Sequence, residues 1–250
     1  MKELEDQLIQ KYEDLLLQAQ QYKKPEREMT IFDTALKNHH ENPITELLAF
    51  FFNPNEKHQL EDCFYQGFIA ALKQYKQYKD FEFGEFKKLS TQQVTDQGKF
   101  IDLWMETDTA LIIVEVKVYH HQNNPFKEYE AWANKKIEYP NRQDQEKRLI
   151  TIVLCPNGKC TIENWLGLSY TQLTTCIRQY VSQYAFNQTL NKWVVFAREF
   201  LLHLESFNRL LDIDMSRLNF VVDNVTIQNK SNNIKKYRYN KFIILAREVI

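Results

Sequence analysis

The sequence is poor in glycine, with five among 250 residues, whereas a typical protein has about 7%. Neither G-x-G-x-x-G nor G-x-x-x-x-G-K-[S/T] occurs, which excludes the glycine-rich phosphate loops of dinucleotide-binding and P-loop proteins. The four cysteines show no C-x-x-C spacing and no histidine partners at zinc-finger intervals. We therefore expect reduced, buried thiols rather than a disulfide framework or a zinc finger.

An excess of charge of one sign is also missing, because 32 Lys and Arg residues balance 33 Asp and Glu residues. This balance argues against a purely electrostatic nucleic-acid binder but is compatible with a local basic groove. The longest apolar runs, such as 47–52 and 111–114, are far shorter than the roughly 20 residues that span a bilayer. The charged N-terminus has no apolar signal region, so we expect a cytoplasmic protein without a membrane segment.

Hydrophobic residues make up 44% of the chain and charged residues 26%, the composition of a globular protein with a real core. Apolar periodicity predicts where helices and strands lie. Helices are expected over 3–22, 43–53, 60–78 and 125–138 and from 170 onward, and strands within 81–95 and over 100–106, 111–118 and 149–155. This order predicts one α/β sheet with helical additions.

Two charged residues, Glu115 and Lys117, interrupt the most hydrophobic strand. Burying an unpaired charge costs several kcal/mol, roughly, and alternation places both side chains on one face. If the preceding hairpin has a two-residue loop at 108–109, paired residue numbers sum to 217 and Asp102 lies opposite Glu115. The alternation within 100–106 places Ile101, Leu103 and Met105 on one face, and Asp102, Trp104 and Glu106 on the other.

Carbon atoms of directly opposite residues lie about 5 Å apart, close enough for Asp102 and Glu115 to share a divalent cation. Ligands that are all oxygen favour Mg²⁺ or Mn²⁺ over zinc. The alternative interpretation is a buried salt bridge of Lys117 with Glu115 or Asp102 that has structural value only.

The arrangement of Asp102, Glu115 and Lys117 on a β-hairpin, behind a helix that bears Glu46, resembles the PD-(D/E)XK nuclease superfamily. More narrowly, the chain is similar to a PD-(D/E)XK family known mostly from bacterial proteins. The similar segments are ENPITELLAFFFNPNEKHQL (41–60), FIDLWMETDTALIIVEVKV (100–118), PFKEY (125–129), and VLCPNG with WLGLSYTQL (within 153–173). The resemblance covers roughly residues 41–205.

The resemblance implies a restriction-endonuclease-like α/β fold, with a central mixed β-sheet in the order αβββαβ flanked by helices. A single nuclease-like domain is then expected over 1–250, with its core at about 41–180. Helical extensions at 1–24 and 185–250 would complete it.

The resemblance also implies roles for individual residues. Asp102 and Glu115 match the metal-binding acids, Lys117 the catalytic lysine, and Glu46 the helical acid that completes the site. The carbonyl of Val116 would be a further ligand of Mg²⁺ or Mn²⁺.

Three further residues match supporting positions of such enzymes. The family usually has Q-x-x-x-Y in the next helix; Tyr129 fits, Pro125 stands where glutamine is expected, and Gln122 is a nearby substitute. His58 matches the histidine of the N-terminal block.

The function implied by the resemblance is metal-dependent hydrolysis of phosphodiester bonds, with DNA as the expected substrate. The expected biological setting is bacterial defence or mobile-element biology. A homodimer is compatible with this reading. The alternatives are a catalytically inactive member that binds nucleic acid or protein, and a purely structural partner-binding protein. Basic and aromatic side chains alternate near the C-terminus, where a nucleic-acid contact would include Lys235, Lys236, Tyr237 and Arg238.

Overall fold

The computed structural model describes residue 14 and residues 29–35, 41–118, 124–138, 147–187 and 191–207. The chain divides into two units, Met29–Leu211 and the combined segments Met1–Glu28 and Asp212–Ile250. All helices and strands below belong to Met29–Leu211. Most of the predicted terminal extensions lie outside the described residues, and the single-domain organisation stays a prediction.

Five strands form one sheet in the order β1-β2-β3-β4-β5. The strands are β1 (Phe86–Val94), β2 (Phe100–Thr107), β3 (Ala110–Val116), β4 (Arg148–Cys155) and β5 (Leu166–Ser169). Neighbours are antiparallel from β1 to β3 and parallel from β3 to β5. The predicted mixed α/β sheet is therefore confirmed.

The burial of the strands explains their sequences. Every residue of β3 is buried, as are the last six of β4, which accounts for continuous apolar runs in place of alternation. β5 was not predicted, because four residues with the sequence LGLS are too short to show a period.

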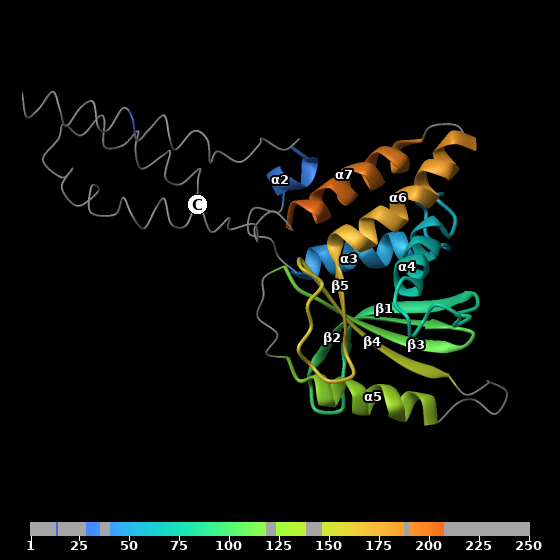
Figure 1. Ribbon diagram of the computed structural model, residues 1–250, viewed down its shortest axis with the longest axis vertical. Coiled ribbons are helices and arrows are strands. Elements are labelled where there is room, and N and C mark those ends of the chain that lie inside the picture. The colour runs from blue at the N-terminus through green and yellow to red at the C-terminus, as the bar shows by residue number, and fades with distance from the viewer. Residues whose placement is uncertain are drawn as a thin grey trace, which may run out of the picture. The chain divides into compact units, whose positions relative to one another are not determined.

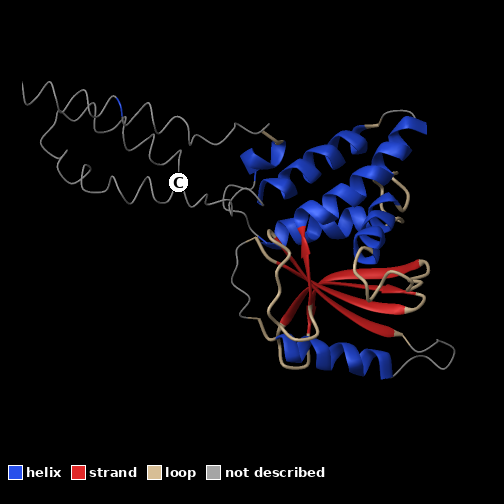
Figure 2. Cartoon of the chain, in the orientation of Figure 1, coloured by secondary structure: helices blue, strands red, loops and turns tan. Residues whose placement is uncertain are grey.

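Helices cover both faces of the sheet (Figures 1 and 2). One face carries α3, α4 and α6, with α7 and the short α2 outside them, and the other face carries α5. The helices are α2 (Ile31–Ala35), α3 (Glu41–Phe52), α4 (Cys63–Lys73), α5 (Phe126–Glu138), α6 (Tyr170–Asn187) and α7 (Lys192–Ser206).

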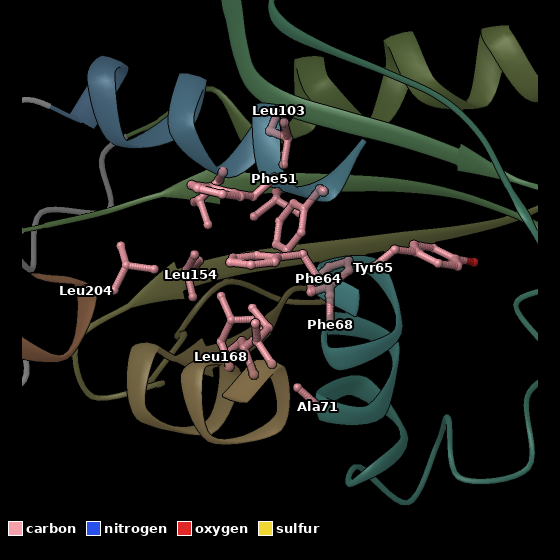
Figure 3. Close-up of a cluster of buried hydrophobic side chains, with 14 of the residues drawn as sticks. Phe51, Phe64, Tyr65, Phe68, Ala71, Leu103, Leu154, Leu168 and Leu204 are labelled. Carbon is pink, nitrogen blue, oxygen red and sulfur yellow. The ribbon is translucent and has the colours of Figure 1, made fainter. Parts of the chain in front are cut away.

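Aromatic rings fill the core between α3, α4 and the sheet (Figure 3). The Phe51 ring stacks on Phe64 with centroids 4.6 Å apart, and Phe52 lies 5.0 Å from Phe68. Tyr65 is buried too, but its hydroxyl points away from the cluster and donates a hydrogen bond to the Gly84 carbonyl. A second, smaller core lies under α5 and includes Trp104, Tyr129 and Trp165.

Helix α3 begins at Glu41, two residues before the predicted start at Pro43. Proline is accepted in the first turn, because its missing N–H would have no partner inside the helix there. This small difference matters, because it makes Glu41 the first residue of the helix.

All four cysteines are free thiols, as expected. Three of them, Cys63, Cys155 and Cys176, are buried as expected, whereas Cys160 is half-buried. Within the described residues, no helix is long and apolar enough to cross a membrane.

Gly67 of α4 allows the close approach of α6, because a Cβ atom at this position would lie 2.4 Å from the Cα of Ile177. We expect Gly67→Ala to lower the free energy of unfolding by about 1–3 kcal/mol, since backbone must move to accept the methyl group. Urea denaturation measures this. Gln66→Ala on the same helix should change stability by less than about 0.5 kcal/mol. Equal denaturation midpoints for Gly67→Ala and wild type would contradict the close contact.

Candidate active site

The hairpin of β2 and β3 has the predicted register. Leu103 pairs with Val114 and Glu106 with Leu111, each pair summing to 217. Extending this register by one pair places Asp102 opposite Glu115, at the end of the paired region.

The backbone pairing of β2 with β3 ends at Leu103 and Val114. Beyond this pair, the Asp102 side chain replaces a backbone carbonyl as the hydrogen-bond acceptor for β3. The Asp102 Oδ2 atom accepts a hydrogen bond of 2.9 Å from the Val116 N–H. A buried N–H group that loses its partner in the ladder needs a replacement, and the Asp102 carboxylate provides it. The same contact holds the carboxylate at the end of β3.

The regular alternation of β2 breaks at the same place. Leu103 and Met105 belong to the core beneath α3, but Ile101 belongs to the core beneath α5. The expectation that Ile101 shares a face with Leu103 was therefore wrong. Gln92 of β1, which the register places opposite Asp102, has a left-handed φ of 49°, so the irregularity includes both strands.

Lys117 lies at the centre of the charged cluster and is 6% exposed. Its Nζ lies 2.9 Å from Glu115 Oε1 and 3.1 Å from Glu41 Oε2. Burial alone would lower the pKa of Lys117, but the negative charges of Glu115, Asp102 and Glu41 raise it above its ordinary value. The lysine is therefore an ammonium ion. The Tyr170 hydroxyl donates to the Lys117 carbonyl at 3.0 Å and holds the backbone there.

The two carboxyl groups differ in burial: Glu115 is only 1% exposed, whereas Asp102 is half-buried. Burial and the nearby Asp102 charge raise the pKa of Glu115 to about 8. Burial also raises the pKa of Asp102, against the opposing effects of Lys117 and the Val116 N–H. The charges of Asp102 and Glu115 repel each other, and a shared proton or a cation relieves this repulsion.

Asn124 and Tyr129 complete the surroundings of Glu115. The Asn124 Nδ2 donates to Glu115 Oε1, and the Tyr129 side chain is hydrogen-bonded to Asn124. Burial and the charge of Glu115 raise the pKa of Tyr129 to about 12, so its hydroxyl keeps its proton.

An amide therefore does reach the site, although Pro125 replaces the glutamine that the resemblance implies. It comes from Asn124, immediately before Pro125, which the sequence analysis did not select. Gln122, proposed as the substitute, lies outside the described residues. The adjacency of Asn124 to Pro125 was the only signal in the sequence.

The helical acid at the cluster is Glu41 rather than Glu46. Glu41 Oε1 accepts from the Val118 N–H at 3.1 Å, and its other oxygen pairs with Lys117. Glu46 is exposed and accepts from the Thr91 hydroxyl of β1 instead. The two residues are five positions apart, about 140° around a helix, so they do not share a face. Glu41 was not predicted as a site residue, because the helix was expected to begin at Pro43, and it begins at Glu41.

His58 is fully buried and does not join the cluster. Its Nδ1 accepts from the Leu60 N–H at 2.9 Å, and its Nε2 lies 2.9 Å from the Asn53 carbonyl. Both ring nitrogens thus bond to the backbone after α3, and burial lowers the pKa of His58. This places a neutral histidine in a structural position within the loop.

The donor set fits a hard divalent cation. Glu115 Oε1 accepts from Lys117 and Asn124, whereas the buried Oε2 has no hydrogen-bond donor among the described residues. That oxygen and the Asp102 carboxylate are the ligand type that Mg²⁺ prefers. In the described parts of the chain, no group of three or more His, Cys, Asp or Glu side chains could hold a metal ion. Two carboxylates, a backbone carbonyl and water would have to suffice, as is common for Mg²⁺.

The predicted nucleic-acid contacts Lys235, Lys236, Tyr237 and Arg238 lie outside the described residues. The structure therefore does not bear on them, and they stay predictions.

A comparison with protein families matches residues 29–202 to the model described as PD-(D/E)XK nuclease superfamily. No curated protein and no solved structure matches the chain. The matched residues include every element from α2 to β5 and every residue of the charged cluster.

The raised pKa of Glu115 predicts how stability depends on pH without metal. Between pH 4.5, its ordinary pKa, and about 8, the unfolded chain has lost this proton and the folded protein retains it. The free energy of unfolding should therefore fall as pH rises, by at most about 1.4 kcal/mol per pH unit. The stabilisation is complete below pH 4.5 and lost above pH 8. Denaturation of wild type and Glu115→Gln in EDTA measures it, because the variant lacks this group but retains the others. Parallel stability curves for the two proteins would contradict the shift.

Proposed function

Because the chain belongs to the PD-(D/E)XK nuclease superfamily, we propose that it is a metal-dependent nuclease that hydrolyses phosphodiester bonds, with DNA as its first substrate. The observation that carries this proposal is the buried cluster in which Asp102, Glu115 and Lys117 meet at the end of β3. A lysine held beside two carboxyl groups that need a cation combines the groups required for hydrolysis of a phosphate ester.

Asp102 and Glu115, with the carbonyl of Val116, would hold Mg²⁺ or Mn²⁺. The N–H and C=O of a strand residue point to the same side, and the Val116 N–H already meets Asp102, which supports the carbonyl as a ligand. When bound, the metal ion polarises the phosphate and lowers the pKa of a water molecule. Asp102 and Glu115 then contribute the negative charge that retains the ion.

Lys117 would stabilise negative charge that develops on the phosphate or orient the attacking water. A preorganised cation in a site that excludes water does this at little cost in reorganisation. Glu41 contacts the Lys117 ammonium and the Val118 N–H at once. We assign to Glu41 the helical-acid role that sequence analysis gave to Glu46, as the residue that positions Lys117.

Asn124 and Tyr129 would orient Glu115. Asn124 and Lys117 both donate to Oε1, which leaves Oε2 for the cation. Second contacts of this kind fix ligand orientation in metal sites.

The second candidate is a catalytically inactive member that binds nucleic acid. It is favoured by the complete pairing of Lys117, whose ammonium contacts two carboxylates in the structure as described. Incubation of the purified protein with plasmid, single-stranded DNA and RNA, each with Mg²⁺, Mn²⁺ or EDTA, separates the two candidates. Cleavage that depends on the metal supports the enzyme, and binding without cleavage under every metal supports the inactive module.

The wider setting is proposed on the same basis. The free cysteines suit a reducing cytoplasm, and the family relationship suggests a bacterial nuclease of defence or mobile-element biology. A homodimer stays a prediction that sedimentation analysis would test.

Lys117→Met and Asp102→Asn should each reduce cleavage by about 10²–10³-fold, the usual effect of one lost electrostatic contact to a developing charge. Asp102→Asn should also weaken Mg²⁺ binding in calorimetry, because a ligand charge is lost, whereas Lys117→Met should still bind the metal. Lys127→Met, at an exposed position on α5, is the matched control and should cleave normally. A purely structural ion pair would give another pattern. Both site variants would then lose about 3–5 kcal/mol of stability, and the wild type itself would not cleave nucleic acid.

The choice between Glu41 and Glu46 can be tested with a matched pair of substitutions. Glu41→Gln should reduce cleavage about 10–100-fold, the usual loss for a group that orients a site residue, because it weakens the contact with Lys117. Glu46→Gln, on the same helix, should remain within about two-fold of wild type, like other changes away from the site. Cleavage rates at saturating Mg²⁺ measure both. The opposite ranking would restore Glu46 as the helical acid.

A further inference from the structure

The end of the β1–β2 hairpin carries two exposed apolar side chains beside the charged cluster. Val94 and Phe100 are direct cross-strand partners, and they are 47% and 54% exposed. Phe100 precedes Asp102 by two residues, so their Cα atoms are about 7 Å apart along the strand. An exposed aromatic ring this close to a site for phosphate chemistry has an apolar surface that no described element covers.

The irregularity at Asp102 decides which way this pair points. Ile101 is buried in the core beneath α5, so its neighbour Phe100 points to the opposite side of the sheet. That side carries α3, whose first residues are Glu41 and Asn42. With regular alternation through Asp102, Phe100 would instead have pointed toward α5.

Two amide side chains approach each other between β1 and α3, the half-buried Gln92, two residues before Val94, and the exposed Asn42. The Gln92 Nε2 is 3.5 Å from the Asn42 Oδ1, at the long limit of a hydrogen bond. Gln92 is opposite Asp102 and has the left-handed φ of 49°, an unfavourable conformation of the type that concentrates at functional sites. These amides can offer hydrogen-bond donors and acceptors to a ligand next to the cluster. Little free energy is lost when their mutual hydrogen bond breaks, because that bond is weak.

A positive charge completes the surface. The turn beyond the apolar pair is closed by the Thr95 N–H, which donates to the Lys99 carbonyl at 2.7 Å, and by the Lys99 N–H, which donates to the Thr95 hydroxyl at 3.1 Å. This turn fixes the backbone of Lys99, an exposed residue that directly precedes Phe100 in the chain. An exposed aromatic ring with a long, exposed lysine next to it in the chain provides the two kinds of group that bind single-stranded nucleic acid, a stacking surface and a positive charge.

We propose that Phe100, Val94 and Lys99 bind an unpaired nucleotide next to the phosphate that is cleaved. The proposal rests on the proposed function and adds a substrate class, single-stranded or locally melted nucleic acid. The nucleobase stacks on Phe100 against Val94, Lys99 pairs with the neighbouring phosphate, and the amides of Gln92 and Asn42 contact the base edge or the sugar. A paired base cannot present its face to the ring, so the surface discriminates against an intact duplex.

The test measures the affinity of the full-length protein for a fluorescently labelled single-stranded oligonucleotide and for the matching duplex, by anisotropy in EDTA. Phe100→Ala should weaken single-strand binding about ten-fold, within the range for loss of one base–aromatic stack, and should change duplex binding by less than about two-fold. Phe100→Trp should restore single-strand binding. Phe186→Ala, at an exposed phenylalanine on α6, is the matched control and should bind as wild type does.

Lys99→Gln should reduce the slope of log affinity against log salt by about 0.7 for the single strand, the value for one lost phosphate contact. Melting curves check that all variants are folded. We expect them to fold, because the Phe100 and Lys99 side chains are exposed.

The result separates this proposal from the proposed function, because binding in EDTA does not depend on cleavage. Unchanged single-strand affinity in Phe100→Ala, or an equal loss on single strand and duplex, would overturn the stacking surface even if the enzyme cleaves. A wild type that binds no nucleic acid would overturn it as well. A change of oligomeric state in Phe100→Ala on sedimentation, with unchanged affinity, would assign the surface to contact with a second copy of the chain.

Discussion

The contact of 2.9 Å between Glu115 and the Lys117 ammonium is the interaction around which the site is arranged. Both residues are almost completely buried at the end of the sheet, where an unpaired charge would cost several kcal/mol, roughly. Elements far apart in the sequence therefore contribute polar groups to this one place. Helix α3 supplies Glu41, the segment before α5 supplies Asn124, and α6 supplies the Tyr170 hydroxyl.

The irregular end of β2 is the second constraint. A regular strand would continue its backbone pairing with β3 past Leu103, but the Asp102 carboxylate accepts the Val116 N–H instead. This exchange satisfies the Val116 N–H and holds the Asp102 carboxylate near Glu115. It also turns Ile101 toward α5, and by alternation its neighbour Phe100 then points toward α3. One local distortion thus affects both the cluster and the surface proposed beside it.

The parts of the site that sequence analysis predicted best lie on one hairpin. A two-residue loop and the period of two along a strand are enough to place Asp102 opposite Glu115, because the partners are near each other in the sequence. The sheet class was predictable for a similar reason, since fully buried strands have continuous apolar runs. The short β5 and the break at Ile101 gave no comparable signal, because neither has a period.

The groups that reach the hairpin from elsewhere were not predictable in the same way. Both Glu41 and Glu46 lie on the helix before the hairpin, and only the docking of α3 on the sheet decides that Glu41 meets Lys117. Similarly, Asn124 became the amide at Glu115 because of where α5 begins against the sheet. The sequence by itself determined the hairpin, its register and the charged residues that the hairpin buries, because local periodicity and short loops specify these. Only the tertiary structure decided which distant side chains neutralise those charges, because that depends on how separate helices dock around the end of one strand.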